Sequence, residues 1–173
     1  MMPSSLPSLG PSSRPSYDPS GNPSFGPSAE RPTGELIRFI IIEQPQGPLN
    51  IQEIIVFDDE GVNVAFNKDV TMSSYWGFPY FASLAVDGDI SGWFNFAHSR
   101  PDDSEPWLRI DLQADYYVNK VVIYNRLSCC QNRLSNSVIY LADSFENVVM
   151  SFTLGSLSSR DLIIEIFRYQ FGY

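Results

Sequence analysis

The stretch at 107–112, Trp-Leu-Arg-Ile-Asp-Leu, alternates between apolar and charged side chains from Leu108 onward. Successive side chains of a β-strand point to opposite faces of a sheet, so the leucines and the isoleucine share one face and Arg109 and Asp111 share the other. The pattern predicts a strand with one buried face. Such a strand is typical of a sheet that packs against a second layer.

Six further stretches are rich in Ile, Val, Phe and Tyr, the residues that favour strands. They are residues 36–42, 51–57, 117–125, 137–141, 148–154 and 162–167. Turn residues such as those at 45–48 (Pro-Gln-Gly-Pro) and 58–61 (Asp-Asp-Glu-Gly) separate them, and no segment has a convincing helical period. The sequence therefore predicts an all-β protein, an antiparallel jelly-roll β-sandwich of about eight strands.

The first part of the chain has a different composition, because Pro-Ser pairs recur every four residues from Pro3 to Pro27. Such a tract has too few apolar side chains to offset the entropy of ordering, so we expect residues 1–34 to be a disordered spacer and residues 35–173 to form the domain. An O-glycosylated stalk and an unmodified linker both fit this composition. The start has neither the basic segment nor the apolar core of a secretory signal, and we expect a fragment of a longer secreted protein.

Composition excludes some classes of function. Twenty acidic residues against 11 basic ones give a net charge of −9, which disfavours nucleic acids and anionic membranes as partners. No apolar run approaches the ~20 residues that cross a bilayer. Nine of the 11 basic residues are arginines, which suit planar hydrogen-bonded recognition.

The tightest group of reactive residues follows the strand at 117–125. Arg126 and Arg133 flank the adjacent cysteines Cys129 and Cys130. A bridge between neighbouring cysteines is geometrically unusual and closes essentially no loop, so its benefit would be a rigid apolar sulfur surface suited to binding. Two reduced cysteines in a turn are the other interpretation, and these residues alone do not separate the two.

His98, the only histidine, lies in the long interval at 67–106, which exceeds normal loop length and suggests a functional surface. Alone it is typical of a surface imidazole. Together with Arg126 and Arg133, it would exchange hydrogen bonds with the hydroxyls of a neutral sugar. Separately, Asp87-Gly88-Asp89 is an ordinary turn sequence whose carboxylates also suit Ca²⁺.

The order of these motifs resembles the F-type (fucose-binding) lectins of the discoidin-like, or coagulation-factor type C, superfamily. The motifs are 63–65 (Asn-Val-Ala), 73–74 (Ser-Ser), 85–88 (Ala-Val-Asp-Gly), His98, 106–112 (Pro-Trp-Leu-Arg-Ile-Asp-Leu), 124–126 (Tyr-Asn-Arg) and 129–133 (Cys-Cys-Gln-Asn-Arg). The resemblance implies that a loop histidine and two arginines grip the sugar while a disulfide packs against its apolar edge. The matching residues are His98, Arg126, Arg133, Cys129 and Cys130. Ser128 replaces the family's Asp, so we expect weaker sugar binding than with a complete motif.

The resemblance also implies a calcium ion and a rearranged chain. The family fold closes with a strand pair near its C-terminus, whereas here 38–42 and 49–57 match that pair, so we expect a circularly permuted sandwich. On this mapping Glu53 and Asp87 supply calcium carboxylates. Backbone oxygens are expected from Leu84, Asp89, Asn95 and Gln52. We further expect the strand at 36–42 to pair with 162–167 or with 51–57.

These features together predict a calcium-stabilised module that binds fucose or a related sugar on extracellular glycans, with no enzymatic activity and with oligomers possible. A first alternative is a discoidin-type domain that adheres to protein or lipid surfaces through Trp76, Phe78 and Tyr80. A second is an enzyme with His98 as base and Asp102 or Asp103 as its orienting group. The second has little support, because no activated nucleophile accompanies the histidine.

Overall fold

A computed structural model describes residues 34–168 except 92 and 161. The expected spacer at 1–34 therefore lies, apart from Gly34, outside the described residues, and so do the last five residues of the expected domain. Among the described helical segments, none is long and apolar enough to cross a membrane.

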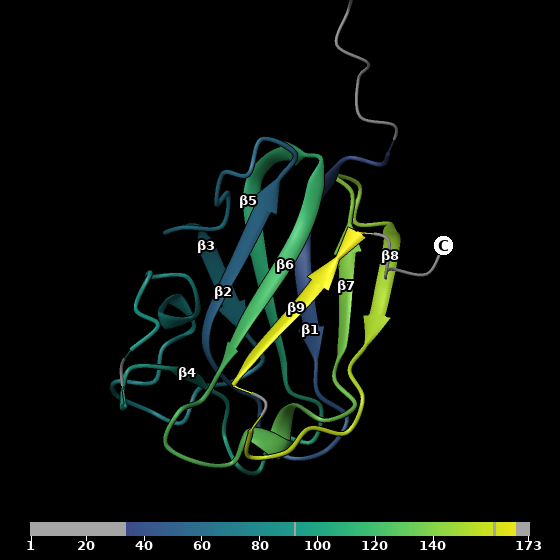
Figure 1. The fold of residues 1–173 in the computed structure, drawn as a ribbon. Helices are drawn as coiled ribbons and strands as arrows, with labels where there is room; N and C mark the ends of the chain where they lie inside the picture. Colours follow the sequence, from purple (N-terminus) through teal and green to yellow (C-terminus); the bar gives the residue numbers. More distant parts are fainter. Residues whose placement is uncertain (1–33, 92, 161, 169–173) are drawn as a thin grey trace, which may run out of the picture. The chain divides into compact units, whose positions relative to one another are not determined.

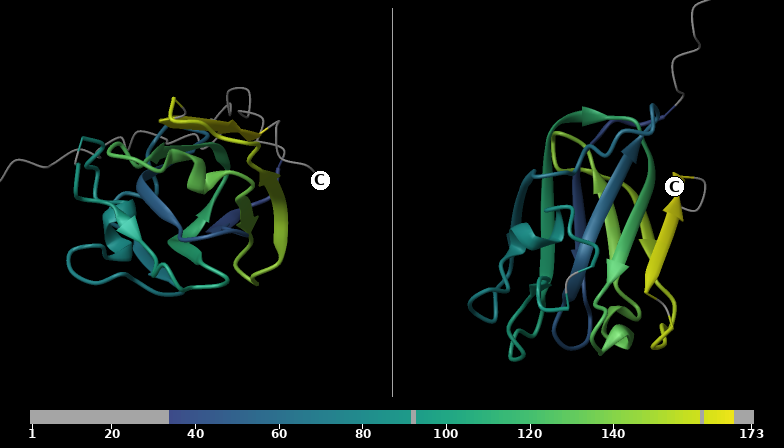
Figure 2. Two further views of the ribbon diagram at one scale, coloured as in Figure 1. Left: turned by 90° about the horizontal axis from the view of Figure 1, so that it is seen from below. Right: turned by 60° about the vertical axis from the view of Figure 1, so that its left-hand side comes forward.

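The described residues form nine strands in two antiparallel sheets that pack face to face (Figures 1 and 2). One sheet has the order β3-β5-β1-β7-β8 and the other β4-β2-β6-β9. The strands are β1 (Ile37–Glu43), β2 (Asn50–Asp58), β3 (Asp69–Met72), β4 (Ala97–His98), β5 (Trp107–Tyr116), β6 (Val118–Asn125), β7 (Val138–Ala142), β8 (Val148–Thr153) and β9 (Ile163–Phe167). Two 3₁₀ turns, η1 (Ala82–Ala85) and η2 (Gln131–Leu134), complete the fold. The predicted all-β sandwich is confirmed.

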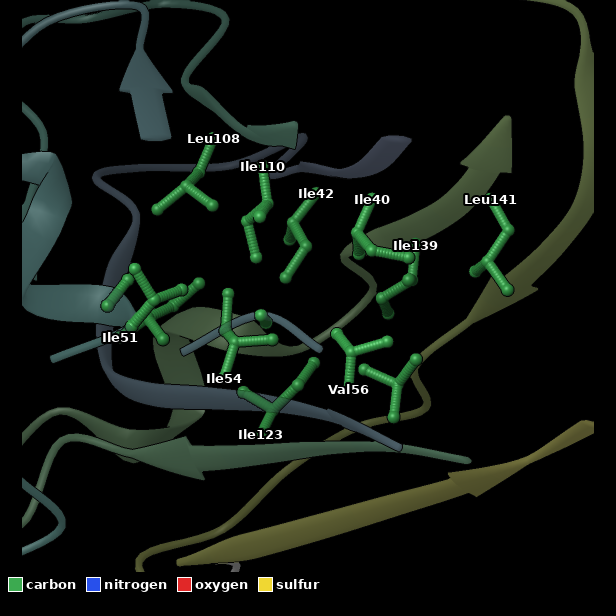
Figure 3. Packing of buried hydrophobic residues seen from close by; sticks show 14 of the residues in the cluster. Ile40, Ile42, Ile51, Ile54, Val56, Leu108, Ile110, Ile123, Ile139 and Leu141 are labelled. Atoms are coloured by element: carbon green, nitrogen blue, oxygen red, sulfur yellow. The ribbon is translucent and has the colours of Figure 1, made fainter. Parts of the chain in front are cut away.

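The core lies between the sheets and follows the alternation seen in the sequence (Figure 3). Leu108, Ile110 and Leu112 of β5 are fully buried against apolar residues of both layers. Burying each such side chain contributes about 1.5–3 kcal/mol. On the outer face of β5, Asp111 forms an ion pair with Arg38. All seven predicted strands are present, with bounds that differ by a few residues at most.

The expected pairing of the first strand is wrong. β1 lies between β5 and β7, so that Ile42 is opposite both Leu108 and Ile139. β2 lies in the other sheet between β4 and β6, and β9 pairs with β6. The connection at 44–49 thus crosses from one sheet to the other instead of turning back as a hairpin. Both N-terminal strands are nevertheless interior strands of the sandwich.

Three short elements in the long interval escaped the sequence analysis. β3, η1 and β4 have only four, four and two residues, which is too few to show a periodic pattern. β4 pairs with the start of β2, where Asn50 is opposite His98. We call the end of the sandwich where β1 and β6 end and β2 begins, at Glu43, Asn125 and Asn50, the loop end.

Candidate functional site

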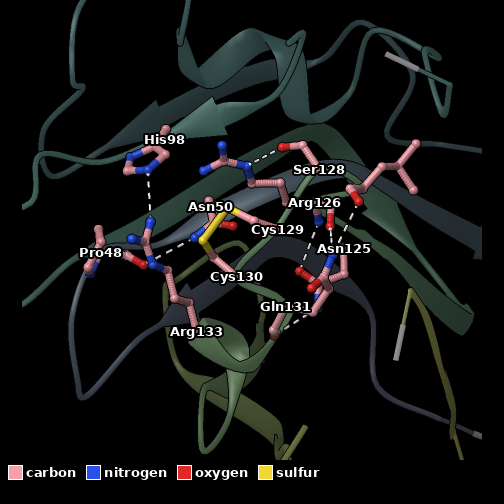
Figure 4. Close-up of a disulfide and its surroundings, with 11 residues drawn as sticks. Pro48, Asn50, His98, Asn125, Arg126, Ser128, Cys129, Cys130, Gln131 and Arg133 are labelled. Carbon is pink, nitrogen blue, oxygen red and sulfur yellow. Dashed lines mark hydrogen bonds between the residues drawn. A yellow bond between two sulfur atoms is a disulfide. The ribbon is translucent and has the colours of Figure 1, made fainter. Parts of the chain in front are cut away.

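Three elements bring His98, Arg126 and Arg133 together at the loop end (Figure 4). His98 ends β4, Arg126 follows β6, and Arg133 lies in η2. β2 pairs with both β4 and β6, so the histidine and Arg126 flank the start of one strand. The Arg133 Nη1 lies 3.2 Å from the His98 Nε2. These residues together with the Cys129–Cys130 pair are called the rim below.

His98 is held as a neutral hydrogen-bond acceptor. Its ring is buried, with 1% exposure, and its Nδ1 lies in hydrogen-bond contact with the Ser99 carbonyl oxygen. A carbonyl only accepts, so Nδ1 carries the proton and Nε2 presents a lone pair to Arg133. Burial lowers the pKa of His98, the charges of Arg133 and Arg126 lower it further, and only the bond to Ser99 opposes them.

Arg126 is fixed by two contacts. Its Nε donates to the Ser128 Oγ at 2.8 Å, and its guanidinium carbon lies 4.3 Å from the centre of the Phe96 ring. Burial and the charge of Arg133 lower its pKa, but an arginine remains ionised in proteins. Ser128 therefore replaces the ion pair of the complete motif with a neutral hydrogen bond.

A disulfide joins the neighbouring residues Cys129 and Cys130, whose Cα atoms lie 3.8 Å apart. The pair is thus a vicinal bridge rather than an ordinary disulfide. Cys130 has a φ of 66° in the left-handed region, and its carbonyl accepts from the Arg133 amide at 3.0 Å. This turn carries the chain from the sulfur atoms directly into η2, so the bridge and Arg133 belong to one compact unit.

Two buried amides that the sequence analysis did not single out hold this loop. Gln131 donates from Nε2 to the Arg126 carbonyl at 2.8 Å, and Asn125 donates from Nδ2 to the Gln131 carbonyl at 2.9 Å. They close the turn that separates the two arginines. Their only signal in the sequence is that polar residues follow an apolar strand.

A second polar cluster gathers the residues predicted to hold calcium. The Gln52 Nε2 donates to the carbonyls of Asp89 and Asn95 at 2.9 and 2.6 Å. Asn95 donates in turn to the Asp87 Oδ2 at 3.1 Å and the Asp89 Oδ2 at 3.3 Å. Leu84 lies in η1, directly before the Asp87 turn.

Glu53 is the most unusual residue of that cluster. Its side chain is fully buried, and neither carboxylate oxygen has a hydrogen-bond partner of ordinary geometry. Burial raises its pKa to about 7; the Asp87 and Asp89 charges also raise it, and the backbone amides of Gly88 and Asp87 lower it. No group of three or more His, Cys, Asp or Glu side chains in the described part of the chain is placed to hold a metal ion. A cation here would need peptide oxygens besides carboxylates.

Residues 84–160, which include the whole rim and Asp87, match the family model of the NedA-like, galactose-binding domain of the F5/F8 type C group. The chain is 36% identical to Fucolectin-4 of Anguilla japonica over 69 residues, or 38% of this chain and 37% of that protein. It is 33% identical to Fucolectin-3 of the same species over 93 residues, or 49% and 50%. These matches support an F-type lectin or discoidin-like domain in the part of the chain that they cover.

The chain spans about half or less of the length of these relatives. A fucolectin of Anguilla anguilla is 34% identical over 86 residues, which are 45% of this chain and 53% of that protein. No solved structure matches the chain significantly. β1 and β2 lie outside the residues that the family model matches.

The residues of the two alternative functions, adhesion and catalysis, also have defined places in the fold. Asp103 accepts hydrogen bonds from Ser73 and Ser74, and Asp102 pairs with Arg100. The group that orients His98 is instead the Ser99 carbonyl. The enzyme hypothesis was wrong on this point. Phe78 is 86% exposed, as expected of a surface anchor. The Trp76 and Tyr80 rings instead lie 5.0 and 5.9 Å from the His98 ring.

Proposed function

We propose that this lectin domain binds fucose or a related neutral sugar on extracellular glycans at the rim. The observation that carries the proposal is the convergence of one neutral imidazole and two guanidiniums beside a bridged cysteine pair. A sugar hydroxyl both donates and accepts, so it suits the pairing of the His98 Nε2 with the arginine N–H groups. The activity proposed is recognition rather than catalysis.

The rim offers each part of a sugar a matching surface. A hydroxyl would donate to the His98 Nε2 and accept from Arg133, which already lie within 3.2 Å of each other. Arg126 uses Nε on Ser128 and keeps its two terminal nitrogens for the ligand. The sulfur atoms of Cys129 and Cys130 would cover an apolar edge of the ring. Each hydrogen bond to a charged donor is worth about 1.5–3 kcal/mol.

Replacing Arg126 with Lys tests the proposal, because lysine keeps the charge and loses the planar fork. Calorimetric titration with fucose should show binding by the wild type and a ten- to hundredfold loss, roughly, in Arg126→Lys. Arg38→Lys makes the same exchange on the outer face of β1, where Arg38 pairs with Asp111, and should bind normally. A wild type that binds neither fucose nor any sugar on a glycan array would refute the function.

We also propose that calcium completes the Glu53 cluster. The fit rests on a buried carboxylate beside Asp87 that has no hydrogen-bond partner of ordinary geometry, and on an all-oxygen donor set of the kind that Ca²⁺ prefers. Glu53 and Asp87 would supply the charged ligands, with backbone oxygens from Leu84, Asp89, Asn95 and Gln52. The ion would lower the cost of burying Glu53 and tie the Asp87 turn to β2.

The location outside the cell is part of the same proposal. A disulfide persists in an oxidising compartment and is rare in a reducing one, which supports an extracellular site for the Cys129–Cys130 pair. Labelling of free thiols in the purified protein tests it. Unreacted cysteines are expected before reduction, whereas two reactive thiols in freshly secreted protein would contradict the bridge.

Adhesion to a surface remains a second candidate because of Phe78, whose ring is almost fully exposed. The net charge of −9 disfavours anionic lipid, which leaves neutral membranes or protein surfaces. Sedimentation with phosphatidylcholine vesicles, compared between wild type and Phe78→Ala, separates this candidate from sugar binding. A lectin should stay in solution in both forms and keep its fucose affinity in the variant.

A further inference from the structure

A pocket of about 490 Å³ lies on the outer face of the five-stranded sheet, where β1 ends. Glu43, the last residue of β1, is opposite Trp107 of β5 and Val138 of β7. These three side chains share the outer face, because the adjacent residue of each strand points into the core. The pocket is lined by residues 43–45, 104–107 and Val138, none of which belongs to the rim or to the Glu53 cluster.

The pocket is acidic. Glu43 and Glu105 are the charged residues among the described side chains that line it. The Glu105 amide donates to the Asp103 Oδ1 at 3.2 Å, so a third carboxylate lies behind this wall. The five strands of the sheet carry two basic residues, Arg38 and Arg109, and each is paired with another carboxylate on the outer face. The lining carboxylates are therefore available to a positively charged ligand.

Gln44 gives the pocket an unused hydrogen-bond donor. The side chain is only 2% exposed, and its Nε2 has no acceptor in the described part of the chain. Its Oε1 accepts from the Gln46 amide at 3.4 Å, which leaves Nε2 as the group without a partner. The Gln44 backbone amide donates to the Pro106 carbonyl at 2.9 Å and ties two walls of the pocket together. A buried donor in this state is costly, so an acceptor supplied by a ligand would stabilise it.

The remaining walls are apolar and suit the stem of a long basic side chain. The Trp107 indole is 36% exposed, and a cation close to an indole face is attracted by the ring. The two prolines of the lining and Val138 offer surface to the methylene groups that precede such a cation. The Tyr140 hydroxyl donates a hydrogen bond to the Glu43 carboxylate, which positions that carboxylate on the same face of the sheet as the indole.

We propose that this pocket binds a basic side chain, lysine or arginine, in a peptide segment of a protein partner. Glu43 and Glu105 bind the charge, and Trp107 covers it. Gln44 donates to a backbone carbonyl of the same segment, so one basic residue satisfies both the carboxylates and the buried donor. The net charge of −9 further favours a cationic partner. A neutral sugar brings no cation to this pocket, so the basic-peptide site differs in its chemistry from the rim.

An NMR titration of the whole chain with a blocked Gly-Ser-Lys-Ser-Gly peptide tests the proposal. We expect a saturable shift of the Trp107 indole N–H signal. The same peptide with norleucine in place of lysine keeps the stem and loses the charge, and it should bind at least about tenfold more weakly. Added salt should weaken binding of the lysine peptide, because partly exposed charges are screened.

Two variants test the residues of the pocket. Glu105→Gln keeps the shape of the side chain, removes one carboxylate and should weaken binding of the lysine peptide about tenfold. Glu60→Gln removes the same charge from the turn after β2 and should leave binding unchanged. Gln44→Met keeps the length of the side chain, loses the donor and should weaken binding about fivefold. A melting temperature at or above that of the wild type shows that each variant folds.

Three results would overturn the proposal. A lysine peptide that causes no shift of the Trp107 signal at millimolar concentration would remove the site. Equal binding of the norleucine peptide would show an apolar groove without preference for a cation. Equal losses in Glu105→Gln and Glu60→Gln would show attraction to the overall charge rather than a pocket. Because no residue of the rim takes part, each of these results would leave the proposed sugar site unaffected.

Discussion

The two polar clusters at the loop end differ in how far their side chains satisfy one another. At the rim, Arg126 bonds to Ser128 and Arg133 lies against His98, so these groups have partners without a ligand. In the other cluster, the buried carboxylate of Glu53 has no hydrogen-bond partner of ordinary geometry. The first arrangement is preformed, because its polar groups are already paired with one another. The second is stable only when a proton or a cation compensates the buried charge.

The largest effect is expected from calcium, which would complete the second cluster. An ion that binds only the folded state at a thousandfold excess over its Kd adds about 4 kcal/mol to the free energy of unfolding. Thermal unfolding in calcium and in chelator should therefore differ by several degrees. Asp87→Ala should abolish the difference, and Asp59→Ala, at the far end of β2, should keep it. Equal melting temperatures of the wild type in both buffers would show that calcium does not stabilise the fold.

Protonation is the other way to compensate the buried charge of Glu53. The stability of the calcium-free protein should therefore depend on pH. The folded state raises the pKa of this carboxyl to about 7, against 4.5 for an ordinary glutamate. The folded state then binds more protons between these values, so stability falls as pH rises through this window. The loss is on the order of 3 kcal/mol. In denaturant unfolding of the Glu53→Gln variant, this decrease in the free energy of unfolding should be absent. Parallel curves of unfolding free energy against pH for wild type and variant would contradict the prediction.

Ser128→Asp should strengthen sugar binding at the rim by a smaller amount. A carboxylate beside the Arg126 Nε replaces a neutral hydrogen bond with an ion pair, which fixes the guanidinium more firmly. A partly exposed pair of this kind contributes about 1 kcal/mol or less, so fucose affinity should rise up to about fivefold. Calorimetric titration of wild type and variant measures it. Weaker binding by the variant would show that the serine is the better partner.

The smallest effect is expected from pH on sugar binding itself. Burial and the two arginines lower the pKa of His98 from its ordinary value of 6.5, so the acceptor at Nε2 stays neutral from pH 8 down to that value. Fucose affinity should be constant over this range and decline only at lower pH. A marked loss between pH 8 and 6.5 would show that His98 titrates normally and that the rim is less preformed than described.

The sequence predicted those parts of the fold that depend on local pattern. Leu108, Ile110 and Leu112 alternate within one strand, and their burial in the sandwich follows from that alternation alone. The pairing of β1 did not follow, because the connection at 44–49 can return to the same sheet or cross to the other without any change in pattern. β4 has two residues, so its existence depends wholly on its partner β2.

The residues of the candidate site likewise divide into those that the sequence predicted and those that it did not. His98, Arg126 and Arg133 were identified by a motif order, and the structure brings all three together. Trp76 was assigned to surface adhesion, because nothing in its neighbourhood in the sequence indicates that its ring meets His98. Contacts between residues about 20 positions apart in an irregular segment depend on tertiary structure and leave no periodic signal.

The direction of the strands determines where the ends of the described chain lie relative to the rim. β1 enters the sandwich at Ile37, opposite Tyr116, and β9 reaches Phe167 opposite Lys120, at the end away from His98 and Arg126. Both ends of the described chain thus leave from one pole, and the rim occupies the other (Figure 1). A tether attached at either terminus would hold the rim facing outward. If the rim binds sugar as proposed, several copies anchored side by side would engage one multivalent glycan and gain in avidity without any new contact.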